Sequence, residues 1–252
     1  MLLPVLDLLV ERGWDVELVT HPRWVSAFNE LRPSINFTNQ LRKSSIDLDE
    51  MTLNLRLAGS KTMEFATLLG VEDLEIHDTV VEVPSNWKQP YEHLHSAIGF
   101  APEAGHRGRQ WPKDFSLELS SELVGTPLAL IGWETEPLLQ SDFDFRGVPL
   151  EGLFGSISCV KALISMDSGA MHVARVLKIP TVAIFGGIDP KVVTNSSDRL
   201  IAMQSGLSCF PCNKNETCGA TYDCIKGIRP TDVLSALTRV TEIRQREILT
   251  VM

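Results

Sequence analysis

The stretch that decides the fold runs from Ala162 to Pro190 and reads ALISMDSGAMHVARVLKIPTVAIFGGIDP. It begins with a short apolar run, long enough for one buried strand, and the turn Asp167-Ser168-Gly169 follows. Apolar residues then recur at helical spacing until Pro180 ends the helix. The β-branched run Thr181 to Phe185 predicts a second strand. A strand–turn–helix–strand unit of this kind builds a parallel sheet.

The turn lies at the carboxyl end of a strand and at the amino end of a helix. Unpaired N–H groups and the helix dipole both favour an anion at such a place. We therefore expect a phosphate site, in which Ser168 caps the helix and donates its hydroxyl while Gly169 lets the backbone approach the ligand. His172 lies one turn further along the same helical face and can reach the same anion. The alternative is a plain capping serine and a surface or core histidine.

Length, composition and charge limit the classes of protein to which this chain can belong. The 252 residues suit one large or two small domains, and 44% hydrophobic and 22% charged residues are ordinary for a soluble globular protein. The net charge of −9 argues against nucleic acid as the main partner. No apolar run approaches the roughly 20 residues that a membrane helix needs.

The apolar start MLLPVLDLLV lacks a basic flank and a cleavage site, so we interpret it as a core helix and not as a signal peptide. The expected compartment is the cytoplasm, with peripheral association at the face of the inner membrane as an alternative.

Helices and strands are expected to alternate along the rest of the chain, which predicts an α/β protein of the doubly wound kind. Helices are expected at 4–12, 23–31, 59–69, 112–123, 147–160 and 231–248. Strands are expected at 15–20, 35–37, 79–83, 96–101, 127–131 and 199–203. The turn-rich residues 84–89 are expected to link two domains.

Two further sets of residues favour a nucleotide ligand. Arg107 and Arg109 fall in a loop after an expected strand, where cations would meet a diphosphate; the alternative is two solvated arginines. A carboxylate just past the strand at 127–131 can accept both hydroxyl protons of a ribose. Glu134 and Glu136 both qualify, and we favour Glu136; either could instead cap the next helix.

Four of the five cysteines fall within CFPCNKNETCGATYDC, at Cys209, Cys212, Cys218 and Cys224. A Cys-x2-Cys pair is the usual half of a metal site, so zinc or iron with a structural role is one interpretation. Disulfides or free thiols are the other. Cys159 stands apart in an expected helix and is most simply a small core residue.

The string Asp-Ser-Gly-Ala-Met-His-Val-Ala, followed by Ile-Pro-Thr-Val-Ala-Ile-Phe-Gly-Gly-Ile-Asp-Pro, closely resembles the signature of glycosyltransferase family 9, the heptosyltransferases of lipopolysaccharide core synthesis. The resemblance extends from about Ile98 to Leu237. It includes Arg109-Gln110-Trp111-Pro112, where the family usually has a lysine in place of Arg109. Some members of the family bind iron at a comparable cysteine cluster.

The resemblance implies a GT-B-like α/β fold, with two Rossmann-like domains facing a cleft. An abbreviated acceptor-side domain would span 1–94, and the nucleotide-sugar-binding domain 95–252. The implied activity is transfer of a heptose or similar sugar from an ADP-linked donor to a lipopolysaccharide core or related glycolipid acceptor. The transfer would invert the anomeric carbon and require no cofactor. The implied donor-binding residues are Asp167, Ser168, Gly169, His172, Arg109 and Glu136.

No catalytic residue is assigned. The family's base lies in a glycine-rich loop ahead of the first helix, and no residue of this chain matches that loop. Asp7, inside the first expected helix, is interpreted as a solvated face residue. Two alternatives therefore stay open: a non-catalytic or truncated nucleotide-sugar-binding protein, and a transferase that uses a GDP- or UDP-linked donor.

Overall fold

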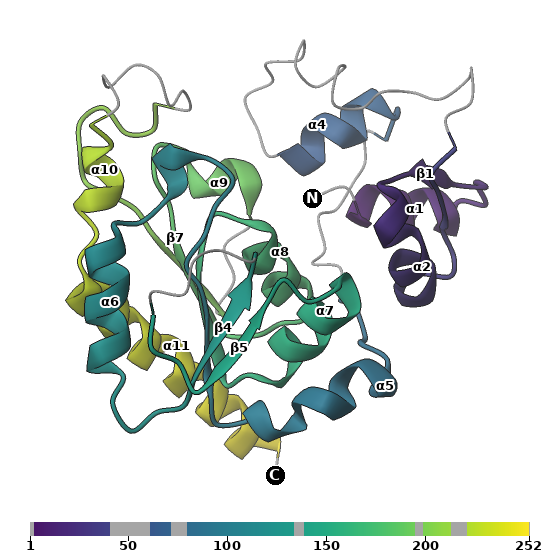
Figure 1. The fold of residues 1–252 in the computed structure, drawn as a ribbon. Coiled ribbons are helices and arrows are strands. Elements are labelled where there is room, and N and C mark those ends of the chain that lie inside the picture. Colours follow the sequence, from purple (N-terminus) through teal and green to yellow (C-terminus); the bar gives the residue numbers. More distant parts are fainter. Residues whose placement is uncertain are drawn as a thin grey trace. The chain divides into compact units, whose positions relative to one another are not determined.

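The computed structural model describes residues 3–40, 61–71, 80–133, 139–194, 199–212 and 221–251. The chain forms two compact units (Figure 1). The amino-terminal unit comprises Met1–Pro84 and Lys191–Asn195, and the carboxyl-terminal unit comprises Ser85–Pro190 and Ser196–Met252. The division falls ahead of the boundary expected between residues 94 and 95, because the first helices after Pro84 pack within the carboxyl-terminal unit.

The amino-terminal unit is a small α/β layer. In chain order it contains α1 (Leu3–Glu11), β1 (Glu17–Val19), α2 (Pro22–Leu31), β2 (Asn36–Thr38) and α4 (Lys61–Leu68). The two strands pair in parallel, and Leu6, Ile35 and Phe37 form a core beside them. Asp7 is half-buried and pairs with the guanidinium of Arg32, so it joins α1 to the end of α2 and is not the solvated residue that we expected.

The carboxyl-terminal unit contains the larger sheet. Its elements are α5 (Ser85–Lys88), the 3-10 helix η1 (Gln89–Leu94), β3 (Ile98–Ala101), the 3-10 helix η2 (Arg107–Arg109), α6 (Lys113–Glu122), β4 (Leu128–Gly132), β5 (Phe143–Arg146), α7 (Leu150–Cys159), β6 (Ala162–Met166), α8 (Gly169–Val176), β7 (Thr181–Ile184), β8 (Leu200–Met203), α10 (Asp223–Lys226) and α11 (Pro230–Val251). The short helix α9 (Pro190–Val193) begins at the end of this unit's first segment.

The sheet has six parallel strands in the order β5-β4-β3-β6-β7-β8. Its central strands β3, β6 and β7 are buried along their whole length, as in a parallel sheet covered on both faces. Helices α6 and α11 contact each other, and α7 and α8 contact each other. Since β-α-β crossovers are right-handed, the reversal of strand order places these two pairs on opposite faces (Figure 1). Of the described helices, none combines the length and the apolar character that crossing a bilayer requires.

The structure differs from the local expectations in three places. Residues 80–83 belong to no strand, although Val81 and Val83 are buried; Thr79 lies outside the described residues. The stretch expected to link two domains does begin at the boundary between the units, but it forms α5 at the start of the carboxyl-terminal unit, where Trp87 packs edge-on against Phe154 with the ring centroids 6.4 Å apart. Strand β5 was not expected, and its alternating sequence FDFR pairs only at the sheet's edge.

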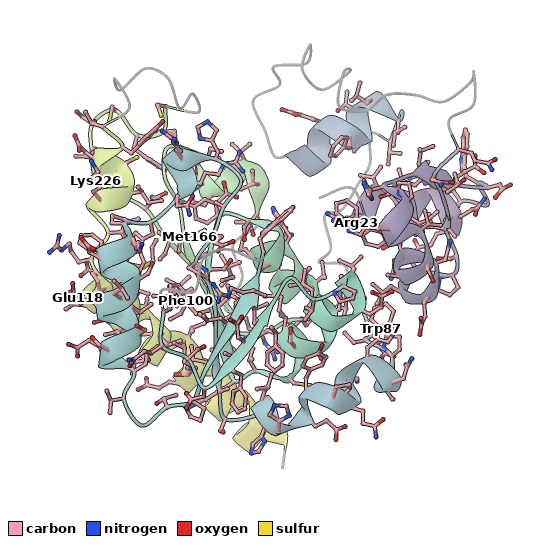
Figure 2. The ribbon with its side chains drawn as sticks, viewed as in Figure 1. Arg23, Trp87, Phe100, Glu118, Met166 and Lys226 are labelled. Atoms are coloured by element: carbon pink, nitrogen blue, oxygen red, sulfur yellow. The ribbon has the colours of Figure 1, made fainter. Side chains whose placement is uncertain are left out.

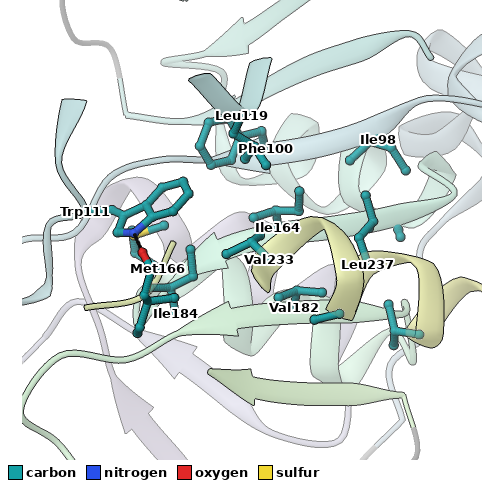
Figure 3. Close-up of a cluster of buried hydrophobic side chains, with 14 of the residues drawn as sticks. Ile98, Phe100, Trp111, Leu119, Ile164, Met166, Val182, Ile184, Val233 and Leu237 are labelled. Atoms are coloured by element: carbon teal, nitrogen blue, oxygen red, sulfur yellow. Dashed lines mark hydrogen bonds between the residues drawn. The ribbon is translucent and has the colours of Figure 1, made fainter. Parts of the chain in front are cut away.

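The main core lies between the sheet and the helices α6 and α11 (Figure 3). Phe100 and Met166 lie inside this unit, whereas Glu118 and Lys226 are exposed on its helices (Figure 2). Trp111 is 3% exposed and its indole N–H donates to the Ile228 carbonyl at 2.8 Å. This bond ties the residues before α6 to the residues before α11, which lie far apart in the sequence.

Replacing Trp111 by phenylalanine should destabilise the protein by about 1–3 kcal/mol, because the buried Ile228 carbonyl loses its donor. Urea unfolding followed by circular dichroism measures this change. Trp133→Phe is the matched control, since Trp133 is 63% exposed and its replacement should stay within about 0.5 kcal/mol. Equal costs for the two variants would show that the Trp111 bond contributes nothing.

Candidate functional site

The site lies where the strand order of the large sheet reverses. From β3 the chain moves outward to β4 and β5, and it then returns to β6 on the other side of β3. Strands β3 and β6 are paired in parallel with Ala101 opposite Ser165, so their carboxyl ends lie side by side. Loops that leave such neighbouring strands in opposite directions open a crevice, which is the usual ligand position in doubly wound sheets.

Asp167 follows β6 directly and is buried, with 4% of its side chain exposed. Its backbone N–H donates to the Ile184 carbonyl at 3.1 Å, which fixes it between β6 and β7. Its Oδ2 lies 3.4 Å from the Nε of Arg109, and neither atom has a hydrogen-bond partner within the part of the chain that the structure describes. Burial raises the pKa of the Asp167 carboxyl, and the charge of Arg109 partly offsets this rise.

Arg109 is held at this position by a close-packed turn. The Nδ1 of His106 accepts the Gly108 N–H at 3.1 Å, which closes the 3-10 helix η2. A side chain at Gly186 would collide with the Gly108 carbonyl oxygen, so the turn rests directly on the backbone that follows β7. The buried Trp111 anchors the other end of the same loop. The guanidinium of Arg109 is thus placed beside Asp167 by one local contact and by contacts from two distant segments.

The start of α8 has its N-terminal amides open. Ser168 is the N-cap residue with extended backbone, but its side chain makes no capping bond, contrary to our expectation. Its Oγ lies instead 3.2 Å from the Oγ of the buried Ser165. The first backbone bond of the helix runs from the His172 N–H to the Ser168 carbonyl at 3.5 Å, so the three preceding amides lie outside the helical ladder. Gly169 is exposed, and a side chain built on it would meet nothing within 4 Å.

His172 is half-buried on α8, one turn after Ser168. Burial lowers the pKa of its imidazole most, nearby cations, Arg175 and Arg109 among them, lower it as well, and together they bring it to about 4. The ring is therefore neutral near pH 7. It can offer a ligand one N–H donor and one acceptor, but it adds no positive charge to the site.

Other predicted residues are not assembled by the described part of the chain. Glu134 and Glu136 lie outside the described residues, and Arg107 is exposed. Cys209 is exposed, Cys212 and Cys224 are half-buried, and Cys218 lies outside the described residues. Among the residues described, no three His, Cys, Asp or Glu side chains gather to hold a metal. The described cysteines alone therefore do not make a metal site, and the predicted centre stays a prediction that depends on Cys218.

Ser165, Gly186 and His106 shape the site, and sequence reasoning did not single them out for this. Ser165 is the single polar residue of an otherwise apolar strand, and this was the sequence feature that could have drawn attention to it. The contacts of Gly186 and His106 with Gly108 form only when the loops are folded, and no local sequence pattern predicts them.

Comparison with known proteins finds relatives of one kind. Residues 148–222 match the model of glycosyltransferase family 9 (heptosyltransferase). A lipooligosaccharide heptosyltransferase 2 from Campylobacter jejuni is 30% identical over 98 residues, which cover 36% of this chain and 29% of that protein.

Two solved structures are similar in fold. Heptosyltransferase II of E. coli, an ADP-heptose transferase, matches with a TM-score of 0.55 at 21% identity, over 69% of this chain and 56% of that one. The iron-containing dodecameric glycosyltransferase TibC from enterotoxigenic E. coli matches with a TM-score of 0.67 at 13% identity, over 95% of this chain and 71% of that one. These matches confirm the predicted GT-B-like α/β fold class. The chain spans less than a third of the curated relative and little over half of heptosyltransferase II.

Gly186→Ala should cost about 1–3 kcal/mol, because the added methyl group meets a backbone carbonyl that cannot turn aside. Gly169→Ala provides the contrast within the same site. It adds a methyl group in open space at a helix start, so urea unfolding should show no loss of stability. An equal change in unfolding free energy for the two substitutions would show that η2 does not pack directly on Gly186.

The lowered pKa of His172 predicts a pH dependence of stability. The folded pKa is about 4 and the ordinary value is 6.5, so between them the unfolded chain binds more protons than the folded chain. The stabilising contribution is complete above pH 6.5 and is lost as the pH falls towards 4. Between pH 7 and pH 5 the wild type should lose about 1–2 kcal/mol more than His172→Gln. Urea titrations at both pH values measure the difference, and parallel losses would contradict it.

Proposed function

We propose that this chain, whose residues 148–222 match the glycosyltransferase family 9 (heptosyltransferase) model, binds a nucleotide-diphosphate sugar and transfers the sugar to a glycan acceptor. The observation that carries the proposal is the open start of α8 beside Arg109, at the carboxyl edge of the sheet where the strand order reverses. Backbone amides, a helix dipole and a guanidinium converge there, and together they suit a diphosphate.

In the proposed reaction an acceptor hydroxyl attacks the anomeric carbon of the sugar. The bond from that carbon to the diphosphate oxygen breaks, and the diphosphate leaves with the electron pair. The hydroxyl proton passes to a base, to which we assign no residue of this chain. Attack from the side opposite the leaving group inverts the anomeric carbon.

Charge grows on the leaving diphosphate during this step, so groups that face it lower the barrier. The amides at the start of α8 and the guanidinium of Arg109 are fixed before the ligand arrives, and preorganised donors of this kind are worth several kcal/mol. These groups can offset the charge without a metal ion, which supports a metal-independent transfer. Asp167 would orient Arg109 and accept a hydroxyl of the sugar, and the neutral His172 would add one hydrogen bond.

We propose an ADP-linked heptose as the donor and a lipopolysaccharide core or related glycolipid as the acceptor. The support is the family match, together with the complex of TibC with ADP-D-β-D-heptose. Glu136 remains our proposed ligand for the ribose hydroxyls. A structural zinc or iron at Cys209, Cys212, Cys218 and Cys224 remains a proposal of the same kind, and no step of the transfer uses it.

Titration calorimetry with ADP, GDP and UDP tests the proposal on the full chain. Arg109→Ala should weaken ADP binding about tenfold to a hundredfold, because a charge-assisted hydrogen bond contributes about 1.5–3 kcal/mol. Arg199→Ala is the matched control. Arg199 donates to the Lys178 carbonyl at 3.0 Å and precedes β8, at the opposite edge of the sheet, so its removal should leave binding unchanged.

The same sample is then given ADP-heptose and assayed for release of ADP, with and without a glycolipid acceptor. Binding together with acceptor-dependent release supports the transferase. Binding without release would favour a nucleotide-sugar-binding protein, and failure to bind any of the three nucleotides would refute the site.

A further inference from the structure

Ser165 is a buried hydroxyl for which the proposed transfer has no direct use. It lies on β6, directly opposite Ala101 on β3, and none of its surface is exposed. A ligand therefore cannot touch it. Its Oγ lies 2.8 Å from the Met166 carbonyl oxygen and 3.2 Å from the Oγ of Ser168.

The direction of these two hydrogen bonds follows from a count of protons. A serine hydroxyl has a single proton, and a carbonyl oxygen can only accept. Ser165 therefore donates its proton to the Met166 carbonyl, and the bond between the two serines must be donated by Ser168. The Ser168 hydroxyl is thus directed back towards β6 and away from the helix that it precedes.

The position of the Ser168 oxygen beside Ser165 has a consequence for α8. A serine at the N-cap ordinarily accepts a hydrogen bond from the second or third helical amide, and that bond is worth about 1 kcal/mol. Ser168 has the extended backbone of an N-cap but makes no such bond. The amides of Ala170 and Met171 hence have no capping bond. Met171 is wholly buried, and Ala170, which is 6% exposed, is the one of the two that a diphosphate could reach directly.

We infer that Ser165 is a positioning residue, which holds Ser168 away from its own helix so that the start of α8 stays open for the diphosphate of the donor. The inference rests on the proposed function for the identity of the ligand. Without Ser165 the Ser168 side chain is free to turn and cap the helix. An incoming phosphate would then have to displace that capping bond before it could reach the amides.

Two measurements on the full chain test this role, with Ser165→Ala, Ser168→Ala and the double variant. The first needs no ligand: amide hydrogen exchange of Ala170 and Met171, followed by NMR of selectively labelled protein. Ser165→Ala should slow exchange at these amides about three- to tenfold, the effect of gaining one capping bond. The double variant has no hydroxyl that can cap, so it should exchange as Ser168→Ala does.

The second measurement is ADP affinity by calorimetry. Ser165→Ala should weaken binding about three- to tenfold in the otherwise unchanged chain, and by less than about twofold in the Ser168→Ala background. Ser156→Ala is the matched control: Ser156 is equally buried, donates to the Leu153 carbonyl at 3.2 Å within α7, and should leave ADP affinity unchanged.

The outcomes separate the two proposals. If exchange at Ala170 and Met171 does not slow in Ser165→Ala, or if the loss of ADP affinity persists in the double variant, the positioning role is overturned. If the unmodified chain binds no ADP, the proposed function fails and the diphosphate is withdrawn as the ligand. The exchange rates still decide whether Ser165 holds Ser168 off the helix.

Discussion

The pairing of β3 with β6 is the constraint on which the candidate site depends. Because Ala101 and Ser165 stand opposite each other, the loop that carries Arg109 and the turn that carries Asp167 leave the sheet at the same point. Both central strands are buried on both faces, so neither can shift its register without exposing apolar residues. The sheet therefore fixes the position of the charged groups more firmly than their own weak attraction could.

The loops above the sheet pack closely against the two glycines that follow β7. Gly186 has no side chain, so η2 can rest on the end of β7, and Gly187 lies in the same way against Cys212, whose Sγ is 3.7 Å from the Gly187 carbonyl oxygen. Two glycines in succession thus bring the segment with Arg109 and the segment with the first two cysteines of the cluster to one point. This close packing gives a physical reason for the pair Gly186-Gly187 after β7, beside the site.

The strand–turn–helix–strand unit could be predicted from sequence because each of its signals is local. Apolar runs, the helix-stopping Pro180 and the position of Asp167 after a strand all act within a few residues. The orientation of Ser168 could not be predicted, since it depends on a hydroxyl buried in the preceding strand. The packing of η2 on Gly186 was missed for the same reason, because its partners are remote in sequence. Strand β5 was missed although its alternating sequence FDFR was a local signal. Glu136 and Cys218 remain sequence-based expectations.

The charges at the site favour a ligand with two different ends. Asp167 is a buried carboxyl whose raised pKa shows that its environment opposes ionisation, and it lies on one side of Arg109 at a distance too long for a good hydrogen bond. An anion placed next to Asp167 would add like charge in a buried position. An anion over the open amides of α8, with the guanidinium of Arg109 nearby, would gain attraction instead, and Asp167 would then be left to accept a hydroxyl. The proposed donor, a sugar joined to a diphosphate, would supply both groups.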